Sequence, residues 1–217
     1  MTVDSDSGDI FGLPQREFAQ ERARRTYEAL IEAAFKVFAE KGYDAAQTPD
    51  IAASAGVSVG TFYRYFSDKK EIYLEVTRRH LLASYHEIMG GLTPDRFDGK
   101  ERRATIEETL TILLDNVTRY PDVQRVFFEM SLRDDDVAHL RNVFDAAARK
   151  ALTGLISVIC PDGEVADPEA TAHMIHASVV ECSNLIAGNR GPMSISRERG
   201  LTALTDLIYR ALFGNER

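Results

Sequence analysis

Helical periodicity constrains the fold of this chain more than any other feature of its sequence. Along nearly the whole length, apolar residues recur at the three- and four-residue spacing that is typical of an amphipathic helix. Val, Ile and Thr nowhere alternate with polar residues over a stretch long enough to predict a convincing strand. The sequence therefore predicts an all-α fold in which each helix buries an apolar stripe.

Glycine, proline and capping residues divide the chain into helical segments. Gly42 is expected to end the first long helix, and Asp68 with Glu71 resembles a capping box. We expect helices over residues 22–41, 48–55, 58–66, 68–89, 101–119, 121–132, 134–159, 168–187 and 196–213. This order indicates an N-terminal arm (1–21), a three-helix head with a helix-turn-helix (22–67) and a larger helical body (68–217).

The composition is that of a soluble globular protein. Of the 217 residues, 44% are hydrophobic and 28% are charged. No apolar run approaches the roughly 18 to 20 residues that a membrane span requires, and the N-terminus lacks the basic start and apolar block of a secretory signal. Cys160 and Cys182 are too few for a disulfide framework. We therefore expect a cytoplasmic protein without a membrane partner.

The net charge of −8 is unevenly distributed along the chain. Residues 16–79 contain 11 Lys and Arg against 10 Asp and Glu, whereas the residues from His80 onward contain 15 against 21. Affinity for phosphate depends on the local placement of charge rather than on the total. The acidic balance belongs to the body, and the near-neutral head is compatible with DNA binding.

Residues 52–66 have the pattern of two short helices joined by a tight turn. Small residues in 52–58 let the helices approach, and Gly56 makes the turn. Phe62 and Phe66 then lie four positions apart and face inward. The more exposed side chains of the second helix are Thr61, Tyr63, Arg64 and Tyr65. This arrangement predicts a helix-turn-helix whose second helix enters the major groove of DNA.

The head resembles the tetracycline-repressor (TetR) family in the order and spacing of its residues. The resemblance covers roughly residues 22–76 and is carried by Ala33-Ala34, Phe38 to Tyr43, Asp50-Ile51-Ala52, Ala55 to Ser58, Gly60 to Phe66 and Asp68-Lys69. It implies a homodimer with one recognition helix per subunit, bound to a palindromic double-stranded DNA operator. It also implies a transcriptional regulator, by default a repressor, that an unidentified small-molecule effector releases from DNA.

The resemblance assigns roles to individual residues of the head. In the family, residues matching Tyr63 and Lys69 hold phosphates, and residues matching 58–61 and Arg64 lie nearest the base edges. Arg64 is chemically suited to guanine, because a guanidinium can bond O6 and N7 together; a solvated charge is its alternative role. For Tyr65, packing and phosphate contact are both open. The expected DNA-binding residues are Thr48, Ser58, Val59, Gly60, Thr61, Tyr63, Arg64, Tyr65 and Lys69.

Three positions depart from the family pattern. Gln47 stands where the family usually has Thr or Ser, so we expect the helix cap to shift to Thr48. Pro49 replaces a frequent Arg, and Val59 replaces a frequent Lys. The operator sequence therefore cannot be transferred from a relative. Three further arginines can reach the DNA backbone or the minor groove, or can remain solvated at the start of the first helix: Arg22, Arg24 and Arg25.

In the family, the body encloses the effector pocket, and its last two helices pair with a second subunit. Candidate pocket residues, each of which could instead be ordinary core, are Tyr85, Met89, Phe127, Phe128, Met130, His139 and Phe144. Candidate dimer contacts, which could likewise be internal core, are Ile175, Val179, Cys182, Ile186, Leu201, Leu204, Ile208 and Leu212. A small, largely apolar effector would change the distance between the two heads.

Two patterns resemble catalytic or metal chemistry. Residues 56–60 fit G-x-S-x-G, but a nucleophile elbow needs a strand before the serine and a sheet beneath it. His173 and His176 could hold a metal ion together with Glu181 or Cys182, or could lie at the surface or the dimer interface. No P-loop, G-x-G-x-x-G or H-E-x-x-H pattern occurs. We expect neither an enzyme nor a cofactor; a helical enzyme and a metal-sensing regulator are the rival classes.

Overall fold

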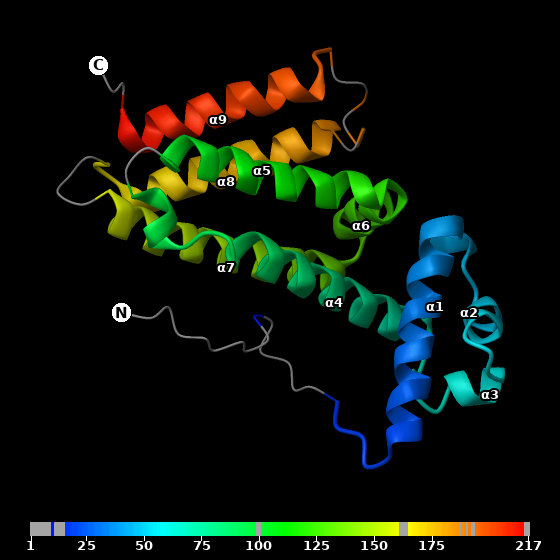
Figure 1. Cartoon of the computed structure of the whole chain (residues 1–217). Coiled ribbons are helices and arrows are strands. Elements are labelled where there is room, and N and C mark those ends of the chain that lie inside the picture. The colour runs from blue at the N-terminus through cyan, green and yellow to red at the C-terminus, as the bar shows by residue number, and fades with distance from the viewer. Residues whose placement is uncertain are drawn as a thin grey trace. The chain divides into compact units, whose positions relative to one another are not determined.

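The computed structural model describes residues 10, 16–98, 101–160, 165–186, 188–189, 191 and 194–214, and these residues form helices without any strand (Figure 1). The all-α prediction is therefore confirmed. The α-helices are α1 (Glu21–Ala45), α2 (Thr48–Ser54), α3 (Val59–Phe62), α4 (Lys69–Met89), α5 (Arg102–Arg119), α6 (Pro121–Arg133), α7 (Asp135–Ile159), α8 (Pro168–Ile186) and α9 (Arg197–Phe213). None of the described helices is both long and apolar enough to cross a membrane.

Most helix bounds agree with the sequence-based expectation to within one residue, and three segments differ. The backbone leaves helical geometry at Gly42 as expected, but helical residues resume after it and reach Ala45. The helix expected to reach Phe66 ends at Phe62 and continues only as turns. A short 3₁₀ helix, η1 (Pro94–Phe97), occupies an expected loop, because its proline suits a first helical turn. The helix breaks expected at Pro161, Gly163 and Pro192 lie outside the described residues.

The chain divides into two compact units. The head unit lies within residues 1–82 and 126–144, and the body unit lies within residues 83–125 and 145–217. The expected boundary between head and body lies after residue 67. The head unit extends beyond it, because the first part of α4 and the corner between α6 and α7 contact the helix-turn-helix residues. Ion pairs also join these two segments to each other: Lys70 Nζ lies 2.8 Å from an Asp134 oxygen and 2.7 Å from an Asp136 oxygen.

The core of the head unit is built around the inner faces of α1, α2 and α3. Leu30, Ile51 and Phe62 are fully buried there, and Phe66 is 2% exposed. The inward orientation expected for Phe62 and Phe66 is thereby confirmed. Burying a side chain of this size stabilises the fold by roughly 1.5–3 kcal/mol.

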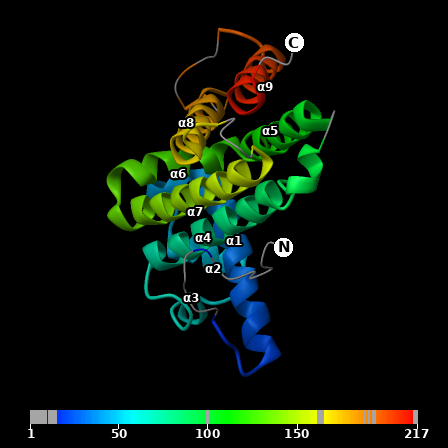
Figure 2. The same ribbon diagram turned by 90° about the vertical axis from the view of Figure 1, so that its left-hand side faces the viewer.

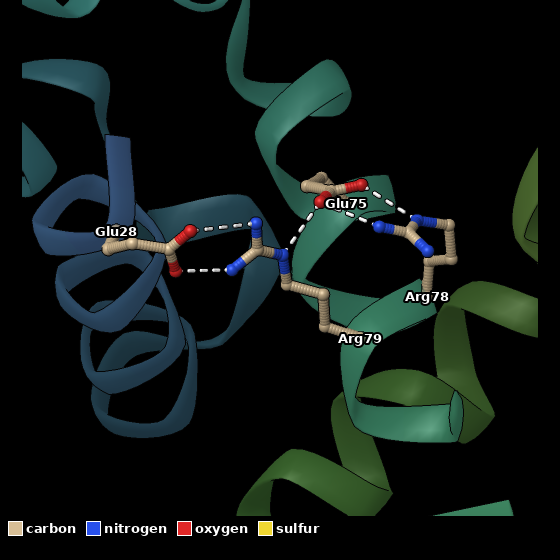
Figure 3. A network of polar contacts seen from close by, with 4 residues as sticks. All are labelled: Glu28, Glu75, Arg78 and Arg79. Atoms are coloured by element: carbon tan, nitrogen blue, oxygen red, sulfur yellow. Dashed lines mark hydrogen bonds and ion pairs between the residues drawn. The ribbon is translucent and has the colours of Figure 1, made fainter. Parts of the chain in front are cut away.

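An ion-pair network joins α1 to α4 in the head unit (Figure 3). The Arg79 guanidinium donates to both carboxylate oxygens of Glu28, at 2.5 and 3.2 Å, and to Glu75 at 2.7 Å. Arg78 donates to the same Glu75 carboxylate at 2.8 and 2.9 Å. Burial pushes the Glu75 pKa upward, but the hydrogen bonds from Arg78 and Arg79 outweigh it, so this pKa lies below its ordinary value.

The body unit packs α5, α8 and α9 against one another (Figure 2). Its core also contains Ile156 of α7, which is 1% exposed, and Phe97 of η1. Buried Ile106 and Leu110 supply the apolar stripe of α5, so the helical periodicity of the sequence is used to cover a shared core.

Gly42 and Gly154 provide a matched test of backbone strain, because a Cβ at either position meets no atom within 4 Å. Gly42 has φ 75°, where an L side chain is strained, whereas Gly154 lies within α7. We expect Gly42→Ala to lower the free energy of unfolding by about 1–2 kcal/mol and Gly154→Ala to raise it by about 0.5–1 kcal/mol. Urea denaturation checks both signs; equal effects at the two positions would contradict the strain at Gly42.

The Glu75 network predicts an acid-sensitive contribution to stability. Because the folded-state pKa of Glu75 lies below 4.5, its stabilising effect is present above about pH 4.5 and is lost as the pH falls through the lowered pKa. We expect Glu75→Gln to flatten the loss of stability in that range and to cost about 1–3 kcal/mol at pH 7. Urea denaturation from pH 3 to 7 measures both effects. Glu129→Gln removes an exposed carboxylate of the same unit and is the control for lost charge. If stability still falls with pH as steeply in Glu75→Gln as in the wild type, Glu75 is not the group responsible.

Candidate nucleic-acid interface

The turn between α2 and α3 is formed by backbone hydrogen bonds around Gly56. The Gly56 N–H donates to the Ala53 carbonyl at 3.1 Å, and the Val57 N–H donates to the Ala52 carbonyl at 3.0 Å. Gly56 has φ 68°, a left-handed conformation that glycine adopts without a steric penalty. The expected turn is therefore confirmed, and Ser58 is preceded by α2 and this turn rather than by a strand.

The cap of α2 corrects one expectation. Thr48 was expected to cap this helix, but Gln47 is the N-cap residue and Thr48 lies inside the first turn. The Gln47 N–H donates to the Asp50 carboxylate at 3.2 Å, and Lys41 pairs with that carboxylate at 2.9 Å. Asp50 three positions after Gln47 completes a capping box, which makes a threonine cap unnecessary. The Thr48 hydroxyl instead lies 3.1 Å from the Tyr63 hydroxyl.

Ser58 caps α3, as expected. Its hydroxyl accepts a hydrogen bond from the Thr61 N–H at 3.1 Å and lies 2.9 Å from the Thr61 hydroxyl. The chain after Phe62 continues in a turn closed by the Tyr65 N–H on the Phe62 carbonyl at 2.9 Å. We call residues 58–65 the reading segment. Its two ends are thus held by local hydrogen bonds.

The reading segment exposes side chains that can contact DNA. Val59 is 38% exposed and Tyr63 is 54% exposed, both unusual for side chains of this size. Arg64 is exposed, and no described residue offers its guanidinium a polar partner. An exposed guanidinium and an exposed phenol on consecutive residues provide hydrogen-bond donors for bases and for phosphates.

Tyr65 packs within the head unit. Its ring centroid lies 6.2 Å from that of Tyr27 and 6.5 Å from that of Phe18. Of the two roles left open by the sequence, this geometry favours packing. A phosphate contact through the Tyr65 hydroxyl stays a prediction.

Lys69 has a position that sequence reasoning missed. Its ammonium donates to the carbonyls of Tyr43, Asp44 and Ala46 at 2.7, 3.3 and 3.0 Å and lies 4.5 Å from the centre of the Tyr43 ring. It therefore ties the start of α4 to the carbonyls that follow the break at Gly42. Its expected phosphate contact stays a prediction and would require the ammonium to leave some of these carbonyls.

The arginines at the start of α1 differ in their contacts. Arg24 and Arg25 pair with Glu21 at 2.7 and 3.1 Å, on the exposed side of the helix. Exposed pairs of this kind contribute little to stability. Arg22 is exposed, and its guanidinium has no polar partner among the described residues.

The expected effector residues fall into both units. Tyr85 and Met89 belong to the body unit and are half-buried. The other five belong to the head unit: Phe127, Phe128, Met130, His139 and Phe144. Met130 is 2% exposed and belongs to the head core, and Phe127 packs against that core. His139 lines an open cleft of about 690 Å³ in the head unit, together with residues of α1 and α4.

The expected dimer residues contribute largely to the core of the body unit. Four of them are buried there: Ile175, Leu204, Ile208 and Leu212. Three more pack against that core in half-buried positions: Val179, Cys182 and Leu201. Ile186 is also half-buried. The large apolar side chains left exposed on these helices are Met174 of α8 (65%) and Leu207 of α9 (54%).

The candidate metal residues do not converge in the described part of the chain. His176 lies 3.5 Å from the Asp145 carboxylate in the body unit, whereas His173 is exposed. No group of three or more His, Cys, Asp and Glu side chains with metal-binding spacing occurs among the described residues.

Comparison with known proteins agrees with the head geometry. Residues 30–76 match the sequence model of the family described as "Bacterial regulatory proteins, tetR family". The transcriptional activator FasR of Mycolicibacterium smegmatis is 33% identical over 132 residues, which are 59% of this chain and 57% of FasR. Matches to the first curated relatives cover 38% to 57% of those proteins, less than two thirds of their length.

Solved structures share the fold over most of the chain. A protein from Mesorhizobium loti assigned to the TetR-family regulators has a TM-score of 0.70 at 20% identity and covers 88% of this chain and 98% of its own. SmeT, the repressor of the Stenotrophomonas maltophilia multidrug efflux pump SmeDEF, has a TM-score of 0.65 at 22% identity, with 88% and 92% covered. The family and these relatives are transcriptional regulators rather than enzymes. Residues 30–76 therefore carry the domain that defines the tetR family of bacterial regulatory proteins.

Proposed function

We propose that this protein is a DNA-binding transcriptional regulator whose reading segment enters the major groove of an operator. The observation that carries the proposal is the exposed pair Tyr63 and Arg64, presented by a segment that is capped by Ser58 and anchored by buried Phe62. Pre-positioned polar side chains on a rigid support are what base readout requires. The match of residues 30–76 to the tetR family model supports the same activity.

Within this proposal, the exposed residues divide into two roles. Arg64 donates to a guanine edge, because its guanidinium has no polar partner among the described residues and can form two hydrogen bonds. Tyr63, whose hydroxyl lies beside that of Thr48, donates to a phosphate. Val59 and Gly60 lie at the start of α3, where a methyl group or the bare backbone can approach a thymine methyl.

The proposed active form is a homodimer on a palindromic operator. Two exposed apolar side chains on neighbouring helices, Met174 and Leu207, are a candidate for part of the contact with a second copy. Two-fold symmetry then places half-sites about one helical turn of DNA apart, or a multiple of that distance.

The proposed signal is a small molecule that binds one conformation more tightly and so releases the operator. The SmeT–triclosan complex supports this step, since a regulator of similar fold binds a small, largely apolar compound. Repression is the proposed outcome, and the activator FasR shows that the opposite outcome occurs among relatives.

Selection of bound DNA from a random pool tests the proposed activity. We expect the full chain to enrich sequences with two inverted half-sites. A compound screen for release of the enriched DNA then tests the effector, and a promoter fusion carrying that DNA tests the sign of regulation. Failure to enrich any sequence at low salt would refute the DNA-reading function, whereas enrichment of a single half-site would refute only the dimeric operator.

Two substitutions separate base reading from phosphate contact. We expect Arg64→Ala to relax the base preference at one position of each half-site, at a cost of about 1–3 kcal/mol for the preferred base. We expect Tyr63→Phe to weaken binding to all sequences alike, because the ring remains and only the hydroxyl is lost. Gel-shift titrations on single-base variants of the selected DNA measure both. An unchanged preference in Arg64→Ala would rule out its role as a base reader.

Replacing one exposed apolar side chain tests the dimer contact. We expect Leu207→Glu to shift the protein from dimer to monomer in analytical ultracentrifugation, because a buried unpaired charge opposes association. Leu132→Glu is the matched control, since Leu132 is 70% exposed on α6 and should leave the dimer intact. A dimer that survives both Leu207→Glu and Met174→Glu would exclude this face.

A further inference from the structure

A side chain from the arm ahead of α1 contacts the end of the reading segment. The Arg16 guanidinium donates to the Tyr65 carbonyl at 2.5 Å. The same guanidinium lies 5.5 Å from the centre of the Tyr27 ring and 5.9 Å from that of Phe66. One arginine thus touches the backbone of the reading segment and the aromatic residues that support it.

The contacted carbonyl belongs to Tyr65, the last residue of the reading segment. The α3 helix has only four residues and dissolves into turns after Phe62. The Tyr65 carbonyl lies in the turn after α3, and a hydrogen bond from a charged donor is stronger than one from a neutral donor. Arg16 supplies such a donor immediately after Arg64, so it constrains the backbone that carries the proposed base reader.

Phe18 attaches the arm at a second point. Its ring centroid lies 5.0 Å from that of Tyr27 and 6.5 Å from that of Tyr65. Tyr27 in turn stacks on Phe66 at 5.2 Å. Arg16 and Phe18, which we call the arm clasp, therefore hold Tyr65 by its backbone and by its ring.

The surroundings of Arg16 favour a guanidinium. Tyr27 and Phe66 line the open cleft of the head unit together with the carboxylates of Glu71 and Glu75. A planar guanidinium can lie against aromatic rings and donate to a carbonyl at the same time, whereas an ammonium has no planar face.

We propose that the arm clasp positions the reading segment, with Arg16 and Phe18 acting through Tyr65 on Tyr63 and Arg64 rather than by touching DNA. The inference rests on the proposed DNA-reading function and adds to it two residues that set sequence preference. The competing role for Arg16 is a direct contact with a DNA phosphate. The two roles differ in salt dependence, because each phosphate contact adds about 0.9 to the slope of log affinity against log salt.

The test compares variants on two DNA fragments, one selected by the wild-type protein and one of mixed sequence. We expect Arg16→Ala to lower the ratio of the two affinities about threefold to tenfold and to leave the salt slope unchanged. Phe18→Ala retains every charge and should lower the same ratio. Arg16→Lys should restore the ratio in part. Glu17→Ala, an exposed neighbour in the same arm, is the matched control and should retain the wild-type ratio.

The outcomes separate the two proposals. Equal losses on both fragments, with a salt slope reduced by about one, would assign Arg16 to a phosphate and overturn the positioning role. If Arg16→Ala and Phe18→Ala both keep the wild-type ratio of the two affinities, the positioning role is overturned as well. If the wild-type protein selects no DNA, the proposed function falls together with this inference, whereas wild-type selection with an unaffected ratio overturns the inference alone. Thermal unfolding of each variant measures whether the head stays folded, including in Phe18→Ala, which removes a half-buried ring.

Discussion

Burial of two phenylalanines makes the reading segment possible. A four-residue helix has no stability of its own, because helix nucleation costs more than its few hydrogen bonds return. Phe62 and Phe66 bind this segment to Leu30 and Ile51 in the head core. The polar side chains between them gain a fixed position from that burial. The head must therefore fold as one unit before Tyr63 and Arg64 can face DNA.

Charged side chains from elsewhere in the head unit hold the helices that surround this segment. Lys69 holds the carbonyls after Gly42, which fixes the spacing between α1 and α2. The ion pairs of Glu28, Arg79 and Glu75 fix α1 against α4. Many charges of the head are thus committed to its own architecture. Arg64 differs from them, because no described residue offers its guanidinium a polar partner.

The sequence predicted the helices well because their signals are local. Caps and breaks such as Ser58 and Gly56 act within a few residues, and periodicity identifies a buried face without reference to its partner. Local signals also explain the errors. Gln47 caps α2 because Asp50, three positions later, completes a capping box. The expectation of a threonine cap overlooked this pairing. Periodicity alone could not predict that Ile175 and Leu204 pack in the core of their own subunit. An apolar stripe has the same spacing whether it packs inside the subunit or against a second one.

Long-range contacts account for what the sequence could not predict at the site. The Lys69 ammonium binds carbonyls that lie at least 23 positions earlier in the chain, and those carbonyls are available because Gly42 breaks the helix before them. Neither residue carries a signal for the other. The contact of Arg16 with Tyr65 spans 49 positions and starts in a segment with no helical pattern. In a head this small, residues outside the helix-turn-helix therefore complete it, and its reading geometry is a property of the folded unit rather than of the motif.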